Sequence, residues 1–140
     1  MRRLRAGRRA ARPLPGGRAA STPIHYLLTP DTFSALHRLA SDEVFHFYLG
    51  DPVEMLQLRP DGSHRVVLAG SDLAAGQRPQ VIVPRGIWQG ARLRAGGRLA
   101  LLCATVAPGF DYADYESGRR ADLLATHPTA HPLITALTRA

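Results

Sequence analysis

Two residues with the chemistry of acid–base groups or metal ligands, His37 and Glu43, lie close together in the stretch from Ser34 to Gly50. The stretch reads as two short strands, over 33–39 and 43–49, joined by a short polar turn. A hairpin of this kind brings His37 on the first strand near Glu43 at the start of the second. An imidazole beside a carboxylate can bind a divalent metal or transfer a proton, so this pair is the first candidate site.

The rest of the chain supplies further short strands that would enclose the pair. Runs of alternating or apolar residues, separated by turn signals rich in Gly, Pro and Asp, predict about eight strands. These cover 22–29, 33–39, 43–49, 53–58, 63–68, 79–84, 87–93 and 98–107. Short helices are expected from Ser117 or Gly118 to Ala125 and over Pro132–Arg139. This spacing is typical of an all-β sandwich, jelly roll or barrel.

The composition is that of one globular domain with a basic arm. The chain has 140 residues, of which 45% are apolar, and a net charge of +7. Residues 1–20 carry seven arginines and no acid, so the other 120 residues are neutral and we do not expect a nucleic-acid partner. We predict that 1–20 is a disordered or non-native arm and that 21–140 is the folded domain. An arm that binds phosphate is the alternative.

The apolar pattern and the cysteine content bear on location. No apolar run approaches the roughly 18 residues of a membrane span, so no membrane segment is expected. The chain has a single cysteine, Cys103, inside an apolar run, which predicts a buried, inert thiol and excludes an intramolecular disulfide. These features fit a cytoplasmic protein.

Five phrases of the chain, in this order, resemble the cupin superfamily, and in particular a family of small single-domain RmlC-like cupins of uncharacterised function. The phrases are IHYLL (24–28), SALHRLASDEVFHFYLG (34–50), PDG (60–62), PQVIVPRGIWQGA (79–91) and TVAPGFDYADYE (105–116). The resemblance implies an all-β double-stranded β-helix, the jelly-roll cupin barrel, with short C-terminal helices. It also implies a homodimer.

The metal-binding motifs of cupins are only partly present. The first motif retains His37, Glu43 and Gly50, with Leu39 in the place of its second histidine. The second retains Pro84 and Gly86, but Gln89 stands in the place of its histidine.

The donor set that remains for a metal is therefore His37, Glu43 and Gln89. Iron(II) and zinc want three strong protein ligands, and a neutral amide is a weak one. We therefore predict that a divalent metal is bound weakly or not at all, and no other cofactor is implied.

Strand alternation predicts where these side chains point. If His37, Glu43 and Gln89 all face inward, they form a polar patch at one end of an otherwise apolar barrel. Trp88 should then face outward. The candidate walls of a ligand pocket are aromatic: Tyr26, Phe45, Phe47 and Phe110. The simpler alternative is that His37 and Glu43 only satisfy each other and that the aromatic residues are core.

The resemblance implies three functions. The first is an isomerase- or epimerase-type enzyme acting on a sugar-like or carbonyl substrate, with His37 as the base, Glu43 as its partner and Gln89 orienting the substrate. The second is a ligand-binding or sensing cupin without catalysis. The third, which the altered motifs favour least, is a metal-dependent oxygenase.

Overall fold

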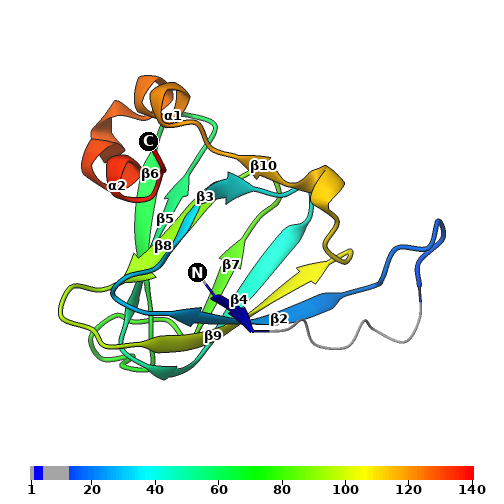
Figure 1. Cartoon of the computed structure of the whole chain (residues 1–140), viewed down its shortest axis with the longest axis horizontal. Coiled ribbons are helices and arrows are strands. Elements are labelled where there is room, and N and C mark those ends of the chain that lie inside the picture. Colours follow the sequence, from blue (N-terminus) through cyan, green and yellow to red (C-terminus); the bar gives the residue numbers. More distant parts are fainter. Residues whose placement is uncertain (1, 5–12) are drawn as a thin grey trace.

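The computed structural model describes residues 2–4 and 13–140, with side chains from residue 13 onward. Its strands form two antiparallel sheets that face each other (Figure 1). The first sheet contains, in spatial order, β1 (Arg2–Leu4), β2 (Thr22–Leu28), β9 (Ala100–Ala107), β4 (Asp42–Gly50) and β7 (Gln80–Val83). The second contains β10 (Glu116–Ser117), β3 (Phe33–Arg38), β8 (Trp88–Leu93), β5 (Val53–Leu58) and β6 (His64–Ala69). This is the predicted all-β jelly roll, and β2 to β9 correspond to the eight predicted strands.

The space between the sheets holds the main core. Apart from the bulged stretches of β3 and β4, alternate side chains of the strands point inward, as the alternating sequence predicts. The fully buried members are apolar, among them Val53, Met55 and Ala104, with exposures of 0%. Each large side chain in such a core contributes about 1.5–3 kcal/mol of burial free energy. The two sheets are therefore held together mainly by the hydrophobic effect.

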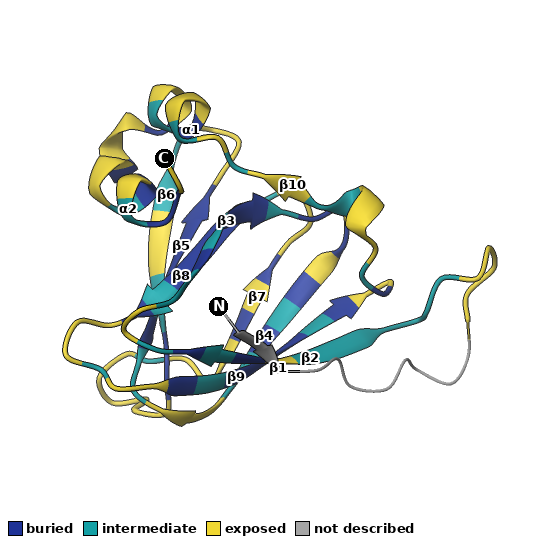
Figure 2. Cartoon of the chain, viewed as in Figure 1, coloured by how far each residue is buried: buried dark blue, intermediate teal, exposed yellow. Residues whose placement is uncertain are grey.

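The outer face of the second sheet is covered by the two helices, α1 (Arg120–Thr126) and α2 (His131–Ala136), with the 3-10 turn η2 (Pro128–Ala130) between them. Leu36, Leu56 and Leu58 of the sheet pack there against Leu123 and Ile134. The sides of the helices that face the sheet are buried (Figure 2). Trp88 packs in this outer cluster, which confirms the prediction that it faces away from the barrel. No helix in the described part of the chain is long and apolar enough to cross a membrane.

A strap, defined here as residues 108–118, crosses from the end of β9 to the second sheet. It contains the 3-10 turn η1 (Tyr112–Asp114) and ends in β10, where Ser117 pairs with His37 of β3. Asp111 caps η1 by accepting a hydrogen bond from the Ala113 amide at 2.9 Å. The strap therefore closes over the end of the barrel at which β3 ends and β4 begins.

The basic arm contributes to the fold where the structure describes it. The sequence predicts a disordered or non-native segment over 1–20, whereas β1 pairs with β2 and Arg18 donates to Asp114 of the strap at 2.5 Å. Residues 1 and 5–12 lie outside the described residues. The predicted domain boundary after residue 20 therefore stays a prediction.

A β-bulge sets the direction of His37. Ser34 pairs with Ala91 and His37 with Gln89, so three steps along β3 match two steps along β8. The extra residue keeps both Ser34 and His37 on the inner face. Gly90 lies opposite the bulge, where an added Cβ would come within 3.0 Å of the Ser34 carbonyl oxygen and 3.1 Å of Leu36 Cγ. Only glycine fits there without moving β3.

We predict that Gly90→Ala lowers the free energy of unfolding by about 1–3 kcal/mol, because the new methyl group is forced against the Ser34 carbonyl. Chemical denaturation would measure this loss. Gly96→Ala is the control: Gly96 has a φ of +85° but open space around its Cβ position, so it tests backbone conformation without the clash. Full stability of Gly90→Ala would contradict the account of the bulge.

Candidate functional site

His37, Glu43 and Gln89 meet inside one end of the barrel. Gln89 of β8 is directly opposite His37 of β3, while Glu43 reaches them from β4 in the facing sheet. All three are buried, with exposures of 6%, 3% and 1% for His37, Glu43 and Gln89. The Gln89 amide nitrogen, Nε2, donates to Glu43 Oε2 at 2.6 Å and lies 3.3 Å from His37 Nε2. The predicted polar patch is therefore present; its role as a site stays a prediction.

The hydrogen bonds assign the proton on His37. Its Nδ1 lies 2.8 Å from the carbonyl oxygen of Ala35, which can only accept, so Nδ1 carries the hydrogen. Nε2 is then the unprotonated nitrogen and accepts from the Gln89 amide. The Gln89 amide is oriented by Glu43. An ionised carboxylate only accepts hydrogen bonds, so the amide NH₂ group, and not the amide oxygen, faces Glu43. The basic nitrogen of His37 therefore faces the polar patch.

One acceptor in the patch has no partner. Gln89 Oε1 is buried and accepts no hydrogen bond within the described residues. Leaving such a group unsatisfied costs about 1–3 kcal/mol. The neighbouring Gln57, directly opposite Gln89 on β5, shows the contrast: its Oε1 accepts from Arg65 at 2.8 Å and its Nε2 donates to the Ile82 carbonyl at 3.2 Å. Within the described residues, Gln89 Oε1 is thus a buried acceptor without a donor, unlike Gln57 Oε1.

A cavity of about 430 Å³ adjoins His37. Its walls come from β2, β3, the strap and the residues after α2: Tyr26, Phe33, Ser34, Ala35, Leu36, His37, Tyr115, Ser117, Gly118, Thr138 and Arg139. The ring of Tyr115 stacks on that of His37 at a centroid distance of 5.1 Å and an interplanar angle of 20°. The strap therefore provides an aromatic lid for the imidazole, and a small organic molecule fits the remaining space.

Tyr115 is the site residue that residue-by-residue reasoning missed. The only sequence signal for it is the phrase from Thr105 to Glu116, which resembles the family but does not by itself place the ring near His37. The contact needs the strap to cross between the sheets, and β10 to pair with β3. Long-range pairing of this kind leaves no local pattern.

The four aromatic residues predicted to line a ligand pocket lie in two different places in the structure. Tyr26 lines the cavity, and its ring contacts that of Phe45 at 5.8 Å inside the barrel. Phe47 packs against the same inner core. Phe110 instead packs edge-on against Tyr112 of the strap at 5.0 Å and is not among the residues that line the cavity.

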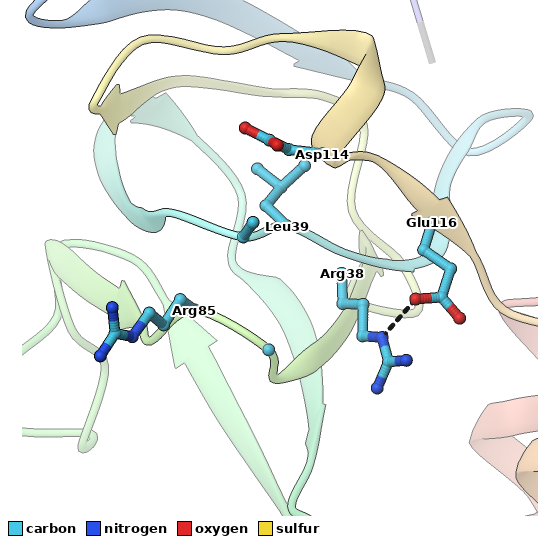
Figure 3. Close-up of a pocket in the computed structure, with 7 residues that line it drawn as sticks. Arg38, Leu39, Arg85, Asp114 and Glu116 are labelled. Atoms are coloured by element: carbon cyan, nitrogen blue, oxygen red, sulfur yellow. Dashed lines mark hydrogen bonds and ion pairs between the residues drawn. The ribbon is translucent and has the colours of Figure 1, made fainter.

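Ion pairs hold the strap in place beside a second pocket. This pocket has a volume of about 370 Å³ and includes Leu39 in its wall (Figure 3). Figure 3 shows Arg38 reaching the Glu116 carboxylate at 2.7 Å, and the same guanidinium lies 4.5 Å above the Trp88 ring. Arg18 binds Asp114, and this hydrogen bond raises the pKa of the Arg18 guanidinium. The lid over His37 is therefore tied to the second sheet and to the basic arm.

The donor set does not fit the metal that cupins commonly bind. The described residues contain no cluster of three or more His, Cys, Asp or Glu side chains that could hold an ion. The Gln89 N–H groups point at both Glu43 and His37, in the position where a cation bridging the two would have to lie. Leu39, which replaces a motif histidine, lines the other pocket. Weak or absent metal binding stays a prediction, and we derive no chemistry through a metal.

Two facing antiparallel sheets in this strand order, with buried His, Glu and Gln side chains at one end of the barrel, are the arrangement expected of a cupin. The comparisons place the chain more closely: a family model described as "Cupin superfamily (DUF985)" matches residues 3–118, so the chain belongs to this family. The matched region includes most of the basic arm.

Protein SO0799 from Shewanella oneidensis has a similar crystal structure, with 32% identity, a TM-score of 0.90 and coverage of 96% of this chain and 85% of that one. The uncharacterized protein YML079W from Saccharomyces cerevisiae is 29% identical over 101 residues, which are 70% of this chain and 50% of that protein. The chain thus spans about half the length of this curated relative. A dTDP sugar isomerase from Desulfovibrio desulfuricans G20 shares the fold alone, at 15% identity, a TM-score of 0.59 and coverage of 69% and 63%.

We expect the purified protein to carry less than ~0.1 equivalent of transition metal, because a neutral amide replaces a strong ligand. Gln89→His should raise zinc affinity by at least about tenfold by supplying a second imidazole. Elemental mass spectrometry and zinc titration would measure both. Gln80→His, on the outer face of β7, is the control. Stoichiometric metal in the wild type, lost in His37→Ala, would contradict this assignment.

Proposed function

We propose that this chain is a small-molecule-binding cupin whose ligand occupies the cavity beside His37, and that it acts as an isomerase- or epimerase-type enzyme on a sugar-like or carbonyl compound. The observation that carries the proposal is the state of the buried patch. An unprotonated His37 Nε2 and an unpaired Gln89 Oε1 lie together at the end of an enclosed barrel. A base beside a free acceptor suits a substrate that presents both an acidic C–H and a hydroxyl group.

The proposed chemistry needs only the side chains of this chain and water. His37 Nε2 removes the proton from the carbon next to the substrate carbonyl, which leaves an enolate and an imidazolium. The Ala35 carbonyl, which accepts from Nδ1, and the nearby Glu43 carboxylate both favour the positive ring. The imidazolium then gives the proton to the former carbonyl carbon, while the hydroxyl proton of the deprotonated carbon moves to the enolate oxygen, which gives the isomer. An epimer forms instead when a water molecule protonates the opposite face of the deprotonated carbon and the resulting hydroxide takes the proton of the imidazolium. Either product has the same atoms as the substrate.

Tyr115 and Gln89 have positioning roles in this proposal. Tyr115 holds the imidazole plane by stacking and shields it from water. Gln89 holds the Glu43 carboxylate in place by donating to it, and its Oε1 accepts from a substrate hydroxyl. Fixing the base in one orientation before the substrate arrives saves the entropy of arranging it during the reaction.

The second candidate is a ligand-binding or sensing cupin without catalysis. One observation favours it: the His37 lone pair is already engaged by a Gln89 N–H, so the base must exchange this hydrogen bond before it can take a proton. In this reading the patch recognises a ligand and does not transform it. A metal-dependent oxygenase is the least favoured function, because the donor set lacks a third strong ligand.

We also propose a homodimer formed through the outer face of the first sheet. The supporting observation is apolar exposure on that face, where Tyr48 and Ile82 are 53% and 54% exposed. The His25 ring lies edge-on to Tyr48 at 6.0 Å, and Cys103 on the same face raises the pKa of the Tyr48 hydroxyl through a hydrogen bond. Two such faces packed together would remove these side chains from water.

Exchange of substrate hydrogen with solvent tests the catalytic proposal. The protein would be incubated in D₂O with simple ketoses, aldoses and their phosphates, and loss of C–H signals followed by proton NMR. We expect exchange by the wild type, slowed at least about 10²-fold by His37→Ala, which removes the base. Glu43→Gln should slow it less, since the amide keeps the shape of the carboxylate.

His46→Ala is the matched control, because His46 lies on the outer face of the same sheet. Its exchange rate should equal that of the wild type. Ligand binding of equal affinity in wild type and His37→Ala, with no exchange in either, would contradict catalysis and favour the binding protein.

A further inference from the structure

The residues that follow α2 form part of the cavity wall. Helix α2 ends at Ala136, although the sequence predicts a helix over Pro132–Arg139. It ends because the chain turns onto β3, where the Leu137 carbonyl accepts from the Leu36 amide at 2.8 Å. The Leu36 carbonyl accepts from Gly118 of the strap, also at 2.8 Å. Strap and tail thus both pair with the residue next to His37.

Arg120 fixes this tail. Its guanidinium donates to Thr138 Oγ1 at 2.8 Å, to the Thr138 carbonyl at 2.6 Å and to the Thr135 carbonyl at 3.1 Å. Leu137 is fully buried at 0% exposure, and Thr138 is 4% exposed. Three hydrogen bonds from one planar cation and a buried leucine hold residues 135–138 in one conformation. The side chain that follows, Arg139, is therefore presented from a rigid support.

In the part of the chain that the structure describes, the cavity wall includes a positively charged arginine and no negatively charged side chain. Arg139 lines the cavity together with the hydroxyl-bearing residues Tyr26, Ser34, Tyr115, Ser117 and Thr138, and no Asp or Glu is among the lining residues. No ion pair joins Arg139 to a carboxylate in residues 13–140. Its guanidinium lies 6.0 Å from the Phe33 ring. This differs from Arg18, Arg38 and Arg92, which all have acidic partners.

We propose that the ligand of this cavity carries an anionic group, a phosphate or a carboxylate, which Arg139 binds, while a hydroxylated part of the same molecule extends to His37. This inference rests on the proposed function, because it takes the cavity beside His37 as the ligand site. A guanidinium presents paired N–H donors that match two oxygens of either anion. The surrounding hydroxyl groups supply further donors, and no acidic wall residue opposes the anion.

Four probes test the inference: the neutral sugar glucose, glucose 6-phosphate, the open-chain carboxylate gluconate, and inorganic phosphate. Their affinities for the full chain would be measured by calorimetry, with amide shifts of Ser117 and Gly118 reporting binding in the cavity. We expect wild type to bind glucose 6-phosphate or gluconate at least about tenfold more tightly than glucose. The two anionic sugars separate phosphate from carboxylate recognition, and inorganic phosphate measures the anion subsite alone.

In Arg139→Gln the affinities for the anionic sugar and for glucose should be nearly equal, while the affinity for glucose and the Tm stay as in the wild type. Arg120→Gln should weaken the anion less, by loosening the tail. Arg119→Gln is the control, because the Arg119 side chain is 83% exposed and pairs with Asp122 of α1. An anion preference that survives in Arg139→Gln, or that falls equally in Arg119→Gln, would overturn the inference.

The remaining outcomes separate this inference from the function on which it rests. Glucose binding without an anion preference in wild type would overturn the role of Arg139 and leave the cavity as a ligand site. Binding of none of the four probes, with no shift at Ser117 or Gly118, would contradict the inference and count against the proposed function too.

Discussion

The arrangement of the polar residues inside the barrel depends on the two hydrogen bonds of the Gln89 amide. One N–H reaches Glu43 in the facing sheet and the other reaches His37 on the neighbouring strand, so a single side chain joins both sheets at the polar end of the barrel. A hydrogen bond to a charged group contributes about 1.5–3 kcal/mol, and burial makes the loss of one partner more costly still. The same two bonds orient the amide and set which nitrogen of His37 accepts a hydrogen bond, and they fill the position that a bridging cation would need. The chemistry expected of the patch follows from this one contact.

The enclosure around the patch comes from segments distant in sequence. The strap brings Tyr115 over His37 and is held by Arg18 from the arm and by Arg38 from β3. The tail after α2 pairs with the same strand, at Leu36. A barrel of two sheets would leave this end open to water, and these two segments convert it into a cavity bounded by aromatic rings, hydroxyl groups and one unpaired arginine. The sheets therefore place the base, and the less regular segments decide what can reach it.

The strands and the inward direction of Glu43 and Gln89 could be predicted from the sequence, because both follow from local alternation. Glu43 and Gln89 have the parity of apolar core neighbours and Trp88 has the opposite parity, whereas the inward direction of His37 depends on a bulge. The bulge before His37 was beyond such reasoning, since it depends on how Gly90 fits against the Ser34 carbonyl in three dimensions. Tyr115 and Arg139 were missed for the same reason: each lies in an irregular segment, and each reaches the site only through pairing with β3. The early end of α2 likewise comes from a hydrogen bond to Leu36, which helix propensity cannot anticipate.

The position of the proton on the His37 ring is the most direct test of this proposal, because base chemistry at this site requires an Nε2 that carries no hydrogen. The two ring nitrogens have distinct ¹⁵N shifts and can be read by long-range ¹H–¹⁵N NMR at neutral pH, with Gln89→Leu as the comparison. We expect a neutral ring with the hydrogen on Nδ1 in the wild type, held by the Ala35 carbonyl and the Gln89 amide, and a mixed or charged ring in Gln89→Leu. A wild-type ring that carries its hydrogen on Nε2, or that is fully charged, would contradict the assignment and with it the proposed role of His37 as the base.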